Sequence, residues 1–176
     1  MMNRTASISM IVLAGVLGLN GQGTRKATPM AFPAEIPPAT ITITGIDGKK
    51  IDITAADLFK LPQHTIKTTG YGAPATFEGV LLTDVLAKVD LPLGEKFHNT
   101  AAAYYLVVEA KDGYRAVFAW AELDLTFMDK PVYVAMKRDG KPLSVKEGPF
   151  ELVAPGEKRG ARWVRQVTAM TLRQAN

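Results

Sequence analysis

Three Asp-Gly dipeptides punctuate this chain, and each stands between two short runs that favour β-strands. Asp47-Gly48, Asp112-Gly113 and Asp139-Gly140 are typical of tight turns. The runs around them alternate polar with apolar residues or are rich in β-branched and aromatic side chains, as in residues 41–44 and 51–53. This pattern favours a β-rich fold in which short strands are joined by hairpins.

The other segments add further short strands and a few short helices. We expect a helix after Thr54 as N-cap, a second over residues 81–89 with Thr83 as N-cap, and a helical turn over 121–123. A second hairpin is expected over residues 104–118. Further strands are expected over residues 64–69, 75–79, 132–136, 150–153 and 163–172. The prediction is therefore an α+β fold with a β-rich mixed sheet, not a doubly wound α/β fold.

The first 23 residues have the features of a secretory signal peptide. Arg4 precedes an apolar run over residues 11–19, and Gly21 and Gly23 have the small-residue spacing of a cleavage site. The run is shorter than the roughly 20 apolar residues of a transmembrane helix. We therefore expect a periplasmic or secreted protein, which contacts a membrane only if an uncleaved signal anchors it.

The next segment, residues 24–39, contains four prolines and no apolar periodicity, which is typical of a tether. A chain of 176 residues suits one domain and is too short for two ordinary ones. We therefore expect a signal peptide over residues 1–23, a Pro-rich tether over 24–39 and a single domain over 40–176.

The chain contains no cysteine, and this absence limits its chemistry. In an exported protein no disulfide can then stabilise the fold, so core packing must do so alone. Thiolate nucleophiles and thiolate metal ligands are excluded as well. His64 and His98 lie far apart without a second ligand at helical or hairpin spacing, so we expect no histidine-based metal site.

Sequence motifs of two large enzyme classes are also absent. There is no Gly-x-Ser-x-Gly nucleophile elbow, and no GxxxxGK[ST] or GxGxxG phosphate loop. His64 is more informative, because it precedes a glycine-containing loop, where ligand contacts are common. A histidine at the surface, or one satisfied within the structure, is the alternative interpretation.

The positive charge of the chain is concentrated near its C-terminus. From Gly156 onward five basic residues face Glu157 alone, which gives this tail a charge of +4, the same as the whole chain. Lys158, Arg159 and Arg162 lie close together, and guanidinium and ammonium groups bind phosphate well. The alternative is that Trp163 is a core residue and these cations are solvated. We expect no nucleic-acid binding, because no aromatic platform is interleaved with the cations.

Residues 148–164 resemble the closing segment of sulfite-oxidase-type molybdopterin-binding domains, with their G-P-hydrophobic, V-x-P-G and basic-x-x-[KR]-W pattern. Residues 77–86 are similar to the aromatic-x-G-x-x-L-x-x-[VL]-L segment of that family, and residues 139–143 add a further match. These segments bracket nearly all of the expected domain. The resemblance implies the molybdopterin-binding fold of that family.

The resemblance also implies where the family's metal ligand would stand. In catalytic members a cysteine thiolate from the loop before the aromatic-x-G segment ligates molybdenum, and the equivalent place here falls near Lys67, within residues 65–71. A lysine ammonium cannot replace a soft, anionic ligand. The positions that resemble cofactor-phosphate contacts are better retained. The candidate cofactor-binding residues are His64, Lys67, Thr68, Thr69, Gly70, Lys158, Arg159 and Arg162.

Three functions follow as hypotheses from the resemblance. The first is a small stand-alone exported domain that binds molybdopterin or another anionic, phosphorylated ligand without the usual molybdenum oxotransfer. The second is an interaction or accessory module that docks on an acidic redox partner protein in the cell envelope. The third is an active molybdopterin-dependent oxidoreductase whose metal is held without cysteine.

Overall fold

A computed structural model describes residues 39–69, 72–88, 93–94 and 102–175 of the chain. The predicted signal peptide, all of the predicted tether except Ala39, and Gly70 lie outside these residues. Contacts divide the chain into the units Met1–Ala34 and Glu35–Asn176, and the fold described below belongs to the second unit.

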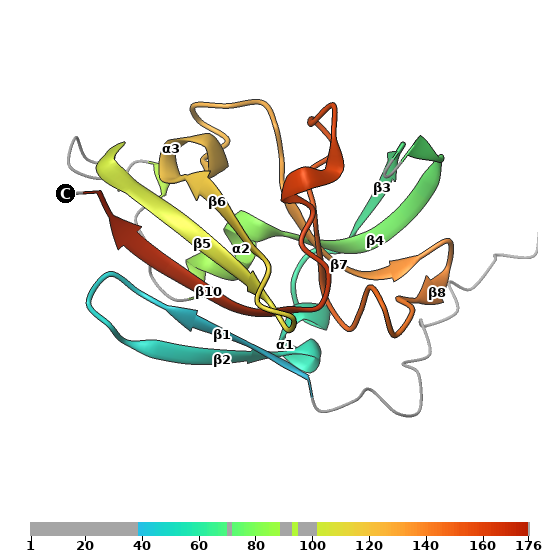
Figure 1. Cartoon of the computed structure of the whole chain (residues 1–176), viewed down its shortest axis with the longest axis horizontal. Helices are drawn as coiled ribbons and strands as arrows, with labels where there is room; N and C mark the ends of the chain where they lie inside the picture. Colours follow the sequence, from blue (N-terminus) through green and yellow to red (C-terminus); the bar gives the residue numbers. More distant parts are fainter. Residues whose placement is uncertain (1–38, 70–71, 89–92, 95–101, 176) are drawn as a thin grey trace, which may run out of the picture. The chain divides into compact units, whose positions relative to one another are not determined.

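The first sheet has five strands in the order β2-β1-β10-β5-β6 (Figure 1). Its strands are β1 (Thr40–Thr44), β2 (Lys50–Thr54), β5 (Tyr104–Ala110), β6 (Arg115–Ala119) and β10 (Val167–Gln174). β1 runs parallel to β10, and the other neighbours are antiparallel, so the sheet is mixed. Both predicted hairpins are confirmed. Gly48 and Gly113 in their turns have φ of 79° and 85°, a left-handed conformation that suits glycine.

The second sheet is antiparallel and has the order β3-β4-β7-β8, with β9 also paired to β7. Its strands are β3 (His64–Thr68), β4 (Ala75–Leu81), β7 (Tyr133–Arg138), β8 (Lys141–Pro142) and β9 (Glu151–Val153). The turn between β7 and β8 is the predicted one, with Asp139 at φ 51° and Gly140 at φ 75°. The α+β prediction with mixed sheet is thus confirmed.

The helices are short, as expected. They are α1 (Ala55–Phe59), α2 (Leu82–Ala87), α3 (Trp120–Leu123) and the 3-10 helix η4 (Gly160–Arg162). Thr54 caps α1 through a reciprocal pair of hydrogen bonds with Asp57, each of 3.2 Å, which confirms the predicted N-cap. Within the described residues no helix has the length and apolar character needed to cross a membrane.

Two boundaries differ from the sequence prediction. Thr83 is not the N-cap of α2, because β4 runs directly into the helix and its last residue, Leu81, takes the cap position without a side-chain hydrogen bond. The last strand starts at Val167 instead of Trp163. η4 and the left-handed Gln166, at φ 49°, bend the chain before β10 begins.

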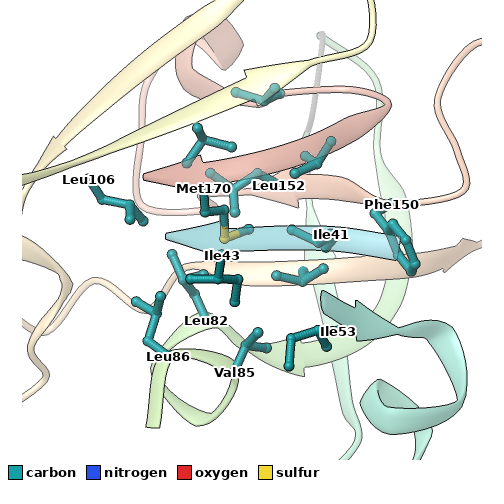
Figure 2. Close-up of a cluster of buried hydrophobic side chains, with 14 of the residues drawn as sticks. Ile41, Ile43, Ile53, Leu82, Val85, Leu86, Leu106, Phe150, Leu152 and Met170 are labelled. Carbon is teal, nitrogen blue, oxygen red and sulfur yellow. The ribbon is translucent and has the colours of Figure 1, made fainter. Parts of the chain in front are cut away.

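The main core lies between the two sheets. Ile41 and Ile43 of β1, Leu106 of β5 and Leu152 of β9 are completely buried in one cluster, which α2 completes with Leu82, Val85 and Leu86 (Figure 2). Side chains in a strand alternate between faces. On β7, Val134 and Met136 accordingly join this main core, whereas Ala135 points into a second cluster.

The second cluster covers the other face of the second sheet. It contains Ile66, Phe77, Ala135, Val153 and Trp163. The Phe77 and Trp163 rings meet edge to face at 5.7 Å, and the indole N–H of Trp163 donates to Ala154 O at 3.0 Å. Trp163 is therefore a core residue, as the alternative interpretation of the basic segment supposed.

Gly79 lies on β4 where the backbone of β7 leaves no space for a side chain. A Cβ atom built there would lie 2.2 Å from the backbone oxygen of Val134, which cannot move without disturbing the sheet. We expect Gly79→Ala to lower the free energy of unfolding by roughly 1–3 kcal/mol, measured by urea denaturation. Gly156→Ala is the matched control, because its nearest neighbour is the flexible side chain of Lys130 at 3.2 Å. Equal stability of Gly79→Ala and the wild type would contradict this packing.

Candidate functional site

The guanidinium of Arg162, at the end of η4, is paired with two carboxylates. Its Nη1 lies 2.6 Å from Glu122 Oε1, and its Nη2 lies 2.5 Å from Glu157 Oε1. The guanidinium carbon also stands 4.5 Å from the centre of the Phe118 ring, a cation–π contact. Nη1 further donates to the backbone oxygen of Val117 at 3.2 Å. The positive charge of Arg162, which the sequence analysis assigned to a phosphate ligand, is therefore already balanced by carboxylates of the protein.

These contacts connect parts of the chain that are distant in sequence. Glu122 belongs to α3, which directly follows β6 in the sequence, and Glu157 belongs to the turn that follows β9. β6 is the edge of the first sheet, and Arg162 covers one of its carbonyl groups. The hydroxyl of Tyr114 adds a hydrogen bond to Ala161 O. Burial alone lowers the pKa of Arg162, but its hydrogen bonds with the two glutamates raise it above the ordinary value.

A small hollow lies beside Arg162. Its volume is about 80 Å³, and its charged lining residues are Glu122, Lys130, Glu157 and Arg162. Two cations and two carboxylates leave it without net charge. Pockets for cofactors and small molecules usually measure roughly 300–1,000 Å³. The hollow as it stands is therefore too small and too balanced to hold a large anionic cofactor.

Lys158 and Arg159 differ from Arg162 in being exposed. Neither has an ion-pair partner among the residues that the structure describes. They directly follow Glu157, which Arg162 holds in place. Two of the three predicted phosphate-binding cations are thus free to meet a ligand, and the third is engaged within the protein.

Lys67, near which the resemblance places the family's metal ligand, lies on β3. Ile66 points into the second hydrophobic cluster, so by strand alternation Thr68 shares its face and Lys67 lies on the opposite, exposed face. Thr69, directly after the strand, is exposed. Gly70 cannot be placed, because it lies outside the described residues. Of the residues near the place assigned to the metal ligand, Thr68 rather than Lys67 faces the cluster that contains Trp163.

Lys67, Thr68 and Thr69 line a shallow depression of about 420 Å³ together with Asp139. The Asp139 carboxylate accepts a hydrogen bond from Thr76 N at 2.9 Å and lies 3.6 Å from Arg138 Nε. This depression is separate from the hollow beside Arg162, which has different lining residues. Of the predicted site residues, Lys67, Thr68 and Thr69 thus line one depression and Arg162 lines another, and neither lining includes His64, Lys158 or Arg159.

His64 begins β3 and is half-buried. Its ring lies 5.7 Å from that of Tyr133, and its Nε2 atom is buried without a hydrogen-bond partner among the described residues. Burial raises the pKa of Tyr133. The alternative of a histidine fully satisfied by its surroundings therefore does not hold for this nitrogen.

The loop after α3 depends on a residue that the sequence analysis did not identify. The Asp124 side chain is 3% exposed and accepts hydrogen bonds from Thr126 N at 2.9 Å, Thr126 Oγ1 at 2.7 Å and Gly94 N. Burial alone raises the pKa of Asp124, but these hydrogen bonds outweigh it and lower the pKa below 3.8. Asp124 thereby fixes the start of the loop that brings Lys130 to the hollow.

The lowered pKa of Asp124 makes stability depend on pH. Its ionised form is favoured by folding, so its contribution is complete above about pH 4 and is lost as the pH falls through the lower folded pKa. At about pH 6 we expect Asp124→Asn to cost roughly 1–3 kcal/mol of unfolding free energy. That difference from the wild type should shrink toward about pH 3. A difference that stays constant in denaturant titrations at both pH values would contradict the assignment.

The double ion pair of Arg162 predicts a large difference between neighbouring arginines. We expect Arg162→Ala to lower the unfolding free energy by about 1–3 kcal/mol, because Glu122 and Glu157 lose their shared partner. Arg159→Ala is the control and should change it by less than about 0.5 kcal/mol. Replacing both glutamates by glutamine in the Arg162→Ala background should restore part of the loss. Equal stabilities of the two alanine variants would show that the ion pairs contribute nothing.

Comparisons with known proteins agree with this fold. The family model described as "Oxidoreductase molybdopterin binding domain" matches residues 30–176. Among solved structures, the crystal structure of the sulfane dehydrogenase SoxCD from Paracoccus pantotrophus is similar, with a TM-score of 0.56 and 20% sequence identity. The similarity covers 76% of this chain and 38% of that chain, so this chain spans well under half of it. No curated protein matches the chain.

The family match begins inside the predicted tether and continues to the last residue. It includes residues 77–86 and 148–164, whose motifs carried the resemblance, and these segments form β4 with α2 and the region from β9 to η4. At 20% identity, the likeness to SoxCD shows a shared fold. The chain belongs to the oxidoreductase molybdopterin-binding domain family, with the sulfite-oxidase-type fold.

Proposed function

We propose that this domain binds a small phosphorylated anion, molybdopterin or another compound, and does not catalyse cysteine-dependent molybdenum oxotransfer. The observation that carries the proposal is the state of the three neighbouring cations. Arg162 is neutralised by Glu122 and Glu157, while Lys158 and Arg159 remain exposed without ion-pair partners among the described residues. Free cations on an anchored loop suit an anionic group.

The available ligand atoms do not fit a cysteine-ligated molybdenum centre. No thiol exists anywhere in the chain. Near the place that the resemblance assigns to the metal ligand stand the ammonium of Lys67 and the hydroxyl of Thr68, and neither is a soft anionic ligand. We therefore derive no oxotransfer step for this chain. The phosphate of a pterin is a separate requirement, which Lys158 and Arg159 can meet.

The anchoring of the basic loop supports binding. The ion pair between Glu157 and Arg162 fixes the residue directly before Lys158, and the hydrogen bond from Glu157 N to Ala154 O, 3.1 Å long, closes the turn. A ligand then meets cations on a loop whose base is already ordered. Such preorganisation lowers the entropic cost of binding.

A second candidate is an accessory module that docks on an acidic redox partner protein. The loop after α3 exposes apolar side chains, with Leu125 44% and Met128 38% exposed, and Lys130 follows in the same loop. Methionine side chains are enriched in protein interfaces, and the charge of Lys130 suits an acidic partner. Because residues 1–23 have the features of a signal peptide, we also propose that the domain acts in the periplasm or outside the cell.

The test uses the full chain, produced with secretion through its own N-terminus. We expect metal analysis to find no stoichiometric molybdenum, and calorimetric titration with pyrophosphate to detect binding. Lys158→Ala/Arg159→Ala should weaken that binding by about tenfold or more, since charge-assisted hydrogen bonds are lost. Lys49→Ala/Lys50→Ala, which removes two exposed cations elsewhere, is the matched control.

Two results would overturn the proposal. Stoichiometric molybdenum in the secreted protein would favour an active enzyme with a non-cysteine metal site. Absence of pyrophosphate, phosphate and pterin binding, together with recovery of one acidic redox protein by cross-linking in the native envelope fraction, would favour the accessory module. In that case, loss of the cross-link in a Lys130→Ala variant would assign docking to the loop after α3, and loss in the Lys158→Ala/Arg159→Ala variant would assign it to the basic segment.

A further inference from the structure

We propose a second anion site, in a depression between the turn that joins β5 to β6 and the segment 160–166. The depression measures about 320 Å³, and Tyr114, Lys146, Trp163 and Arg165 are among its lining residues. Its ligand is an oxyanion carried on a planar group, such as an aryl phosphate. Lys158 and Arg159 do not line it, so this site is independent of the one proposed above.

Gln166 joins the three segments that form the depression. Its backbone N–H donates to Glu147 O at 2.8 Å, and its carbonyl accepts from Lys111 N at 3.0 Å. Its side-chain amide donates to Val145 O at 2.7 Å. One residue thus fixes both the β5–β6 turn and the turn that carries Lys146.

The backbone of Gln166 indicates that this arrangement is maintained against strain. Its φ is 49°, in the left-handed region that residues with a Cβ atom rarely adopt. Such a conformation persists where the surrounding contacts over-determine it, and it is concentrated at functional sites. Here the contacts to Glu147, Lys111 and Val145 supply that constraint. The depression is therefore a preformed feature of the fold.

The charge of the depression favours an anion. Lys146 and Arg165 are both exposed side chains that line it, and Asp112 is the acidic residue in the lining. One carboxylate oxygen of Asp112 is occupied by a hydrogen bond from Tyr114 N at 2.9 Å, which closes the turn. The charged lining residues are thus two cations and one carboxylate, a net charge of +1, which favours an oxyanion.

Aromatic side chains form the apolar part of the site. Tyr114 is 49% exposed, and its hydroxyl is fixed by the hydrogen bond to Ala161 O, which orients the ring beside the depression. The indole N–H of Trp163 is already used by Ala154 O, so Trp163 contributes only an apolar edge. A planar ligand group can stack on Tyr114 while its oxyanion meets Lys146 and Arg165.

The experiment titrates the full chain with phenyl phosphate, and with inorganic phosphate as the probe that lacks a ring. We expect phenyl phosphate to bind more tightly than phosphate, and Lys146→Ala/Arg165→Ala to weaken it by about tenfold or more. Tyr114→Ala should reduce the advantage of phenyl phosphate over phosphate. Lys141→Ala/Arg173→Ala removes two other exposed cations and should leave binding unchanged.

Amine labelling of the wild-type protein gives a second readout that does not depend on the folding of any variant. Phenyl phosphate should protect Lys146 from acetylation and leave Lys141 reactive. Protection of Lys158 alone would assign the ligand to the other site and overturn this inference while supporting the proposed function. Wild-type affinity of Lys146→Ala/Arg165→Ala, or no binding at about 1 mM phenyl phosphate, would also overturn it.

Discussion

The contact of α3 and β6 with the turn after β9 depends on the guanidinium of Arg162. Its guanidinium serves Glu122 of α3, Glu157 after β9, the ring of Phe118 and a carbonyl on the edge strand β6. An exposed surface ion pair contributes only about 0–1 kcal/mol. Here two carboxylates, a ring and a backbone group share one partly buried cation, so we expect its removal to weaken the contact of α3 and β6 with the turn after β9.

The residues of the basic C-terminal segment differ in their surroundings. Trp163 packs in the second cluster, Arg162 connects structural elements, and Lys158 and Arg159 are exposed, which is why we propose them as the anion-binding cations. The family resemblance assigns Lys158, Arg159 and Arg162 the same role, because a sequence motif gives the type of each side chain and not its partners in space. The spatial neighbours decide which cation can contact a ligand.

The fold could be predicted further than the site. The Asp-Gly turns set the hairpins, and the Thr54 cap set α1, because both are local rules of backbone geometry. The partners of Arg162 could not be predicted in the same way. Glu157 lies near it in sequence, but Glu122 is 40 residues away and carries no local signal. The left-handed Gln166, which moves the start of β10, likewise depends on distant hydrogen bonds.

We propose that Arg162 stays paired with Glu122 and Glu157 while the neighbouring cations Lys158 and Arg159 bind the ligand. A crystal structure of the secreted protein grown with pyrophosphate tests it directly. We expect Arg162 to keep both Glu122 and Glu157, and the anion to lie against Lys158 and Arg159. A pyrophosphate that displaces Glu157 and binds the guanidinium of Arg162 would contradict it.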